Sequence, residues 1–169
     1  MFPSRYTSAR IQLRIFQQAR KNIPGSGFKD DLQFLQSKDL DMSIRLGALL
    51  AFDALLLTAA LNPIAASPGA PLSLDAPTQA LFVTLVSLSI GVLSAAAIFC
   101  VRGILIGEEF DLKGADGNQD VLVQRFLAAY CSSIDVQMRM IRLSSMTTIA
   151  GGIMAAAVSV AIMAVKMAR

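Results

Sequence analysis

Asp53 is the residue of this sequence whose type and position most clearly suggest chemistry. It lies inside the apolar run Leu49–Leu57, and a carboxylate at the centre of a membrane helix costs about 2.5–3.5 kcal/mol or more. In a structural interpretation, Asp53 is buried against a neighbouring helix, where it bonds to a Ser or Thr or carries its proton. In a functional interpretation, it carries a proton or ion step. We favour the structural interpretation and keep the functional one as its alternative.

Other side chains that support chemistry are few. The sequence has no histidine, and its two cysteines, Cys100 and Cys131, are far apart, so the usual zinc, haem and iron sites are not expected. The acidic pairs Asp30–Asp31 and Glu108–Glu109 are adjacent residues, which point about 100° apart on a helix and do not converge on one substrate. We therefore expect no enzyme activity, no metal and no cofactor, and we interpret both cysteines as packing residues.

Three apolar runs dominate the 169 residues: Ile44–Ile64, Ala80–Val101 and Leu143–Val165. The first contains only Arg45 and Asp53 as charged residues, and the other two contain none. Each run reaches the roughly 20 residues that cross a bilayer core. Charged residues make up 16% of the chain, against about 25% in soluble domains. The sequence therefore predicts an all-α integral membrane protein with three transmembrane helices and the lipid bilayer as a partner.

Lysine and arginine are unevenly distributed between the segments outside these runs. Residues 1–45 carry eight of them, residues 62–79 none and residues 102–142 five. Because basic residues concentrate on the cytoplasmic side, we predict a bacterial inner-membrane protein whose N-terminus and residues 102–142 are cytoplasmic. Residues 62–79 and the C-terminus are then outside. Lys166 and Arg169 oppose this rule and are interpreted as snorkelling to the interface. The net charge of +3 comes from the membrane flanks and does not indicate nucleic-acid binding.

Residues 1–43 are predicted to form a cytoplasmic helical region. The first helix, Ser4–Asn22, is amphipathic and basic, and two alternatives stay open: it lies on the anionic inner leaflet, or it packs on this protein or a partner. The second helix, Phe28–Ser43, is expected to run without a break into the first span. Its acids are interpreted as a solvated face that pairs with nearby basic residues; the acids are Asp30, Asp31, Asp39 and Asp41, and the bases Lys29, Lys38 and Arg45.

Residues 44–166 are predicted to form the three-span membrane domain, with 102–142 as a cytoplasmic helical segment inside it. The first span is expected to end at Asn62–Pro63, and Asp75 or Ser73 to cap the second. Residues 113–118 read as a loop. From Gln119 to Met167 the apolar spacing predicts one helix of roughly 48 residues, about 70 Å long. Its cytoplasmic half needs a partner, either the N-terminal helices in a small bundle or another subunit.

Small residues at four-residue spacing mark faces through which membrane helices associate. The candidates for helix packing are Gly47 and Ala51, followed by Ala54 and Thr58, in the first span, Ser87, Gly91 and Ala95 in the second, and Thr148, Gly151, Gly152, Ala155 and Ser159 in the third. Hydroxyls in the second and third spans are candidate partners for Asp53, namely those of Thr84, Ser87, Ser89, Ser94, Thr147 and Ser159.

The run Met42–Leu57 reads Met-Ser-Ile-Arg-Leu-Gly-Ala-Leu-Leu-Ala-Phe-Asp-Ala-Leu-Leu-Leu. It resembles the first-span signature of a bacterial membrane family that includes the transmembrane effectors of pyrimidine-cyclase (Pycsar-type) antiphage systems. That signature reads Asp-Lys-Ala, two residues, then Leu-Leu-Ala-Phe-Asn-Ala-Leu-Leu. Arg45 matches the lysine and Asp53 the asparagine, while Ile44 stands in place of the acid. The resemblance implies a membrane effector that reacts to a cyclic nucleotide by disturbing the bilayer.

Three functions are compatible with these features. The first is a non-catalytic accessory subunit that interacts with other membrane proteins, or with further copies of itself, through its small-residue faces. The second is the signal-responsive effector or pore that the resemblance implies. The third is a proton- or ion-coupled transport component that uses Asp53, which would need oligomerisation because one chain has only three spans.

Overall fold

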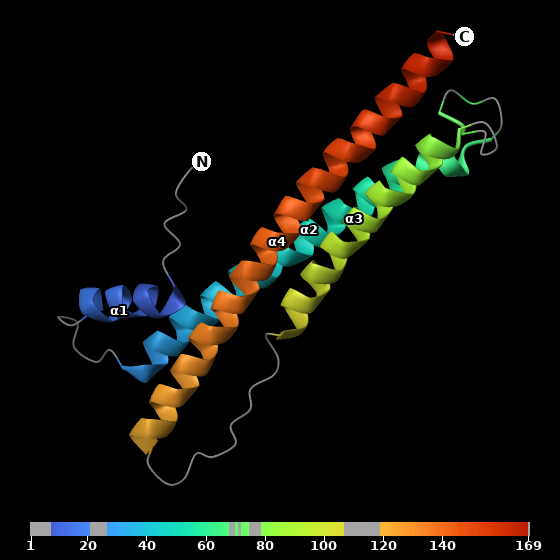
Figure 1. The fold of residues 1–169 in the computed structure, drawn as a ribbon. Helices are drawn as coiled ribbons and strands as arrows, with labels where there is room; N and C mark the ends of the chain where they lie inside the picture. The colour runs from blue at the N-terminus through green and yellow to red at the C-terminus, as the bar shows by residue number, and fades with distance from the viewer. Residues whose placement is uncertain are drawn as a thin grey trace.

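The computed structural model describes residues 8–20, 27–67, 70, 72–74, 79–106 and 119–168, with the side chains of 119–120 excepted. This part of the chain forms the helices α1 (Ala9–Arg20), α2 (Phe28–Ala65), α3 (Ala80–Leu105) and α4 (Gln119–Met167), and it contains no strand (Figure 1). Helices α2, α3 and α4 are long and apolar enough to cross a membrane. The predicted all-α fold with three candidate membrane spans is therefore confirmed.

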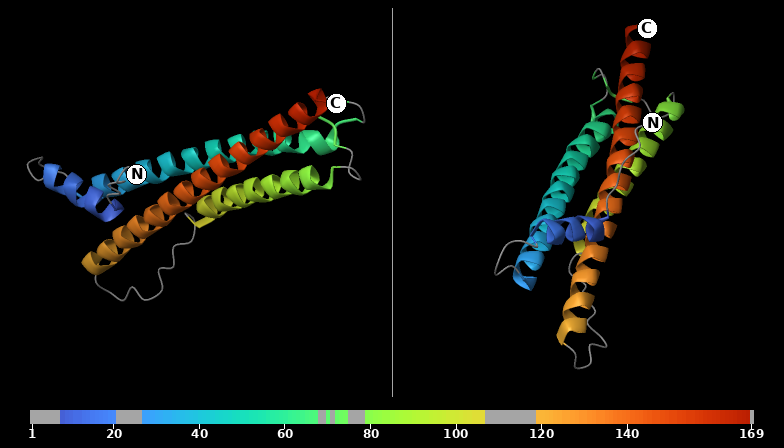
Figure 2. Two further views of the ribbon diagram at one scale, coloured as in Figure 1. Left: turned by 45° about the horizontal axis from the view of Figure 1, so that its top comes forward. Right: turned by 90° about the vertical axis from the view of Figure 1, so that its left-hand side faces the viewer.

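The three long helices form an elongated bundle in which α2 and α4 run in the same direction, and α3 runs in the opposite direction and packs against both. Helices α2 and α4 have 38 and 49 residues, about 57 and 73 Å at 1.5 Å per residue, whereas the bilayer core is about 30 Å thick. Both continue past the end of α3 on the same side, where α1 lies across them (Figures 1 and 2). A membrane can therefore enclose α3 while the N-terminal halves of α2 and α4 extend beyond it.

Helix α2 runs unbroken from Phe28 into the first span, as predicted, but the expected end at Asn62–Pro63 is wrong. The helix continues to Ala65 with Pro63 inside it. Proline removes one N–H donor, yet its fixed φ is compatible with a helix. The Ala66 N–H still bonds to Asn62 O at 2.9 Å, and the returning loop donates Leu74 N–H to Pro63 O at 3.1 Å. The loop therefore stabilises this last turn.

The expected cap of the second span is also corrected. Helix α3 begins at Ala80 after Gln79, and the Ser73 hydroxyl bonds to Ala70 O instead of a helix N-terminus. Asp75 and the predicted loop 113–118 lie outside the described residues.

The same loop contacts the C-terminal end of α4 through Lys166. Its Nζ lies 2.6 Å from Ala70 O and 2.8 Å from Ser73 Oγ. Lys166 thus holds the α2–α3 connection against α4, an interaction that the interpretation of snorkelling did not include.

At the opposite end, α4 has the helical partners that its apolar face requires. A buried cluster combines α1, α2 and α4, and its members are Ala9, Leu13, Leu35, Met42, Cys131, Ile134 and Met138. This confirms that the N-terminal helices pack on the first half of α4. Of the two alternatives for the amphipathic helix, the structure shows packing on the protein itself. On which side of a membrane this bundle lies remains part of the functional proposal.

Candidate functional site

Asp53 is completely buried, at 0% exposure, where α2, α3 and α4 meet. The Thr148 hydroxyl of α4 donates a hydrogen bond of 2.6 Å to Asp53 Oδ1. On the α3 side, Cys100 Sγ lies 4.0 Å from Asp53 Oδ2. The carboxyl group is thus placed between two other helices, as expected for a buried acid within a membrane span.

The polar contacts continue from Cys100 to the backbone of α3. Cys100 Sγ is 2.9 Å from Ser144 Oγ, and the Ser144 hydroxyl donates to Ala96 O at 3.0 Å. Cys100 has a single proton, and both Ser144 Oγ and Asp53 Oδ2 are acceptors for it. We call Asp53, Thr148, Cys100 and Ser144 the Asp53 network.

This network connects the three membrane helices through side chains on each of them. Ser144 and Thr148 lie one turn apart on α4, so both face the same side of that helix, and Cys100 and Asp53 come from α3 and α2. Because the Thr148 bond of 2.6 Å is much shorter than the 4.0 Å contact with Cys100, Thr148 is the principal donor to Asp53. The arrangement cross-links the helices by hydrogen bonds in the interior. The described residues contain no group of three His, Cys, Asp or Glu side chains placed to hold a metal ion.

The hydroxyls expected to be partners of Asp53 were the wrong ones. None of the six bonds to it, and four of them donate to carbonyls of their own helix, namely Thr84, Ser89, Thr147 and Ser159. Such back-bonding is the usual local alternative for hydroxyls in helices. Ser144 and Thr148 are hydroxyls one turn apart, but so are Thr84 and Ser87, so this spacing alone does not identify the partner of Asp53.

The small residues separate into an interior group and an outward group. Thr148 and Gly151 are buried, and a Cβ added at Gly151 would lie 2.8 Å from Leu93 Cγ. At Gly152 a Cβ would lie 3.4 Å from Leu56 Cδ1, an ordinary contact. These residues let α4 approach α3 and α2 closely. The half-buried members are Ala95, Gly152, Ala155 and Ser159.

The outward group belongs to α2 and α3. Gly47, Ala51, Ser87 and Gly91 are exposed in the single chain, and a Cβ at Gly47 or Gly91 would meet no atom within 4 Å. These four residues therefore do not serve packing within one chain.

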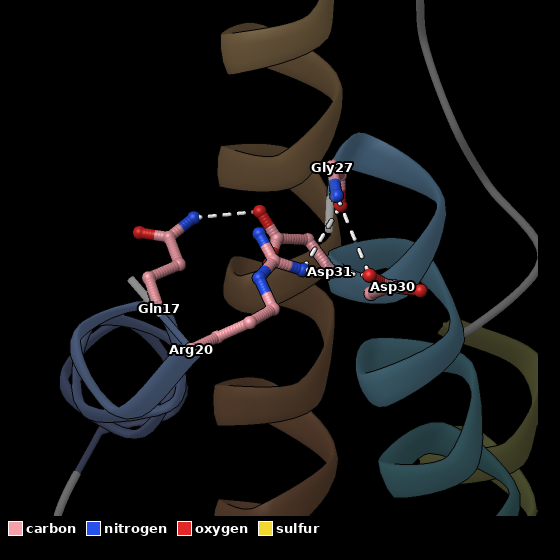
Figure 3. A network of polar contacts seen from close by, with 5 residues as sticks. All are labelled: Gln17, Arg20, Gly27, Asp30 and Asp31. Atoms are coloured by element: carbon pink, nitrogen blue, oxygen red, sulfur yellow. Dashed lines mark hydrogen bonds and ion pairs between the residues drawn. The ribbon is translucent and has the colours of Figure 1, made fainter. Parts of the chain in front are cut away.

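A second polar cluster attaches α1 to the beginning of α2 (Figure 3). Arg20 Nη1 lies 2.9 Å from Asp31 Oδ1 and 3.5 Å from Asp30 Oδ2, and Gln17 Nε2 donates to Asp31 Oδ2 at 2.8 Å. Arg20 also donates to Gly27 O at 2.9 Å. The side chains of Arg20 and Asp31 are only 14% and 7% exposed, so this ion pair is more protected than a surface pair. We call these contacts the α1 latch.

The latch corrects the interpretation of the acidic residues as a solvated face. Asp31 is buried and pairs with Arg20, and Asp39 accepts a hydrogen bond of 2.9 Å from Gln137 of α4. Only Asp41 pairs as expected, with Arg45 at 3.0 Å. The other end of α1 is also held, because Asp135 of α4 accepts the Ala9 N–H at 2.9 Å. A carboxylate from another helix thus caps the α1 N-terminus.

A groove of about 360 Å³ lies between α1 and α4. Its polar lining includes Arg10, Arg14 and Gln124, and Leu13, Leu127 and Cys131 contribute apolar surface. No described residue forms an ion pair or hydrogen bond with Arg10 or Arg14. Two guanidinium groups one helical turn apart above an apolar floor suit an anion that also carries an apolar part. No motif in the sequence indicates this groove.

The described residues thus offer the buried Asp53 network and the groove beside the α1 latch as candidate sites. Comparisons of the chain with protein-family models, with curated proteins and with solved structures give no match.

Proposed function

We propose that this protein is a non-catalytic interaction subunit of a larger membrane complex or of a homo-oligomer. The observation that carries the proposal is a row of small residues on the outward side of α2, formed by Gly47, Ala51, Ala54 and Thr58, all exposed in the single chain. We call this row the α2 stripe. The side of α2 that packs on α3 and α4 is a different one, with Leu46, Asp53 and Ala60 buried on it.

The α2 stripe has the chemistry that helix association in lipid requires. Lipid tails are as apolar as leucine, so membrane helices associate by close packing, which small side chains permit. The steps from Gly47 to Thr58 are four, three and four residues, which keeps the row on one side for about 16 Å. The one hydroxyl in it, Thr58 Oγ1, donates to Ala54 O at 2.9 Å and therefore adds no unsatisfied donor.

A pair of matched double variants tests the α2 stripe. Gly47→Leu with Ala51→Leu is expected to weaken association about tenfold or more, because larger side chains separate the helix backbones. The control is Ala48→Leu with Ala59→Leu, two exposed positions about 100° around α2. Association is measured by energy transfer between labelled copies in lipid vesicles and by co-purification from native membranes. Unchanged association in the stripe variant, or an equal loss in the control, would contradict the proposal.

The proposal includes the orientation deduced from basic residues. The end of the bundle that carries Arg45, Arg102, Arg139 and Arg142 is placed in the cytoplasm of a bacterial cell, and the Ala70 loop outside. In support, Lys166 is the basic residue described at the opposite end, and its ammonium group is bound by the oxygen atoms of Ala70 and Ser73 in the loop. Labelling from outside intact cells should reach a cysteine introduced at Ser67.

A second candidate function is the signal-responsive effector, and the groove between α1 and α4 favours it. Arg10 and Arg14, which pair with no described residue, could bind the phosphate of a cyclic nucleotide, the signal that the resemblance implies. A ligand there would touch α1, whose position depends on the latch at Asp31 and on the Asp135 cap. Movement of α1 would uncover the apolar side of α4 around Cys131, which is 1% exposed.

Alkylation of Cys131 reports the position of α1. Asp31→Asn removes the charge that Arg20 and Gln17 contact and is expected to speed Cys131 alkylation about tenfold. Asp41→Asn, which breaks only an exposed pair, is the control. Peptide mass spectrometry separates Cys131 from Cys100, which α1 does not cover. If the effector candidate holds, a cyclic nucleotide changes the native rate, and Arg10→Gln with Arg14→Gln abolishes that change. If the latch variant responds and the nucleotide has no effect, the effector candidate fails.

A further inference from the structure

The three membrane helices carry arginines at one common level. A Cβ added at Gly103 of α3 would lie 3.0 Å from Leu46 Cδ1 of α2 and 3.1 Å from Met140 Cβ of α4. These three residues are therefore neighbours across the bundle. The residues that precede them in the sequence are Arg45, Arg102 and Arg139. The Cα atom of each arginine therefore lies within a few ångströms of this level along the bundle.

This level coincides with a boundary of the apolar part of the bundle. Arg45 precedes Asp53 by eight residues on α2, about 12 Å along the helix, which is close to half of the roughly 30 Å bilayer core. Helix α3 ends a turn beyond Arg102, at Leu105. The arginines thus lie where lipid phosphates lie when the spans are in a bilayer.

Arg102 differs from Arg45 in having no counter-charge among the described residues. Arg45 pairs with Asp41 at 3.0 Å, whereas no described residue forms an ion pair or hydrogen bond with Arg102. Next to Arg102, a groove of about 390 Å³ lies along the outward side of α3 and is lined by Ala97, Ile98, Val101, Arg102 and Leu105. The surface that lines the groove is entirely apolar, because Arg102 contributes only the hydrocarbon stem of its side chain, and Ile98 is 63% exposed.

We propose that this groove binds an anionic phospholipid, with its phosphate on Arg102 and the start of an acyl chain along Ile98 and Val101. The groove is an apolar floor, and Arg102, whose stem lines it, carries the charge beside it at the membrane boundary. This matches the order of charge and hydrocarbon in such a lipid. Guanidinium groups bind phosphate oxygens by paired hydrogen bonds. The attraction of one basic side chain to an anionic leaflet corresponds to a preference of roughly fivefold.

The absence of tryptophan from the chain allows a direct test by fluorescence. Ile98→Trp places a single reporter in the groove, and Leu81→Trp places one on the same helix, about 25 Å away toward its other end. Each variant is reconstituted in phosphatidylcholine vesicles that contain phosphatidylglycerol, with bromine, a contact quencher, on the acyl chains of either lipid in turn.

The expected result is that brominated phosphatidylglycerol quenches the Ile98→Trp reporter roughly fivefold more effectively than its mole fraction predicts. The Leu81→Trp reporter should show no preference. Adding Arg102→Gln should abolish the preference, and adding Arg139→Gln, which removes the same charge from α4, should leave most of it. Equal quenching by both lipids at Ile98→Trp would overturn the proposal. So would a preference that survives Arg102→Gln or falls equally with Arg139→Gln, because general attraction to the arginines would then explain it.

Discussion

Gly151→Leu is expected to destabilise the membrane bundle by about 3 kcal/mol of unfolding free energy, at the upper end of the range for overpacked cores. A Cβ at this position would already lie 2.8 Å from Leu93 Cγ and 2.9 Å from Leu93 Cδ2, and Leu93 is itself completely buried. A leucine has no room beside it, so α4 must move away from α3. That movement would also stretch the bond between Thr148 and Asp53, since Thr148 lies one turn from Gly151 on α4.

Gly91→Leu is the matched control, because it makes the same chemical change on a neighbouring helix. A Cβ at Gly91 would meet no atom within 4 Å, so its cost within one chain should stay below about 0.5 kcal/mol. Both variants gain similar helix propensity, which cancels in the comparison. Unfolding of the monomer in mixed detergent micelles of increasing dodecyl sulfate content measures both free energies. Equal losses in the two variants would show that the close approach of α4 to Leu93 does not stabilise the bundle.

The sequence predicts the helices of this protein well because their signal is local. Three uninterrupted apolar runs fix the spans, and the absence of proline after Gln119, with Gly151–Gly152 as the only glycines there, favours a single long α4. The end of α2 was misjudged at Pro63 because its stability depends on a non-local bond, from Leu74 N–H to Pro63 O. Local propensity rules do not include such contacts.

The contacts of individual side chains could be predicted much less well. Asp53 was recognised as a buried acid, yet its partner Thr148 was assigned to packing. The rotation of α4 relative to α2 cannot be deduced from the sequence of either apolar segment alone. For the same reason, the sequence did not predict which small residues face inward. Gly151 and Gly91 have the same kind of neighbours in sequence, and only the relative orientation of the helices separates the interior position from the outward one.

The charged residues near α1 show a third reason for failure. Asp31 has basic and acidic neighbours in sequence and looks like part of a solvated helix, but Arg20, eleven residues earlier, is its partner. Arg20 is the last residue of α1 and Asp31 lies in the first turn of α2, so their pairing depends on how α1 lies across α2. Such long-range ion pairs depend on the tertiary arrangement and leave no periodic signal.

Substitutions of Asp53 should distinguish a structural acid from one that carries protons or ions. Asp53→Asn keeps a carbonyl oxygen where Asp53 Oδ1 accepts the Thr148 hydroxyl at 2.6 Å, and it introduces the residue found in the resembled signature. We expect its unfolding free energy to change by less than about 1 kcal/mol. Asp53→Leu removes the acceptor and inserts a larger side chain into a completely buried position. We expect this variant to lose about 3 kcal/mol, mainly from overpacking.

Thr148→Val completes the test, because it removes the donor while keeping the shape of the side chain. The hydroxyl of Thr148 can turn back to a carbonyl of α4 when Asp53 is absent, so the Asp53→Leu loss should come mainly from volume. Combining Thr148→Val with Asp53→Leu should then cost little more than Asp53→Leu alone, whereas Thr148→Val alone leaves the acid without its principal donor and should cost about 1–3 kcal/mol. A structural Asp53 predicts this order of stabilities and no ion flux. If reconstituted vesicles instead show a pH-dependent conductance that Asp53→Asn abolishes without loss of stability, Asp53 serves transport, and the interaction-subunit proposal gives way to proton- or ion-coupled flux through an oligomer.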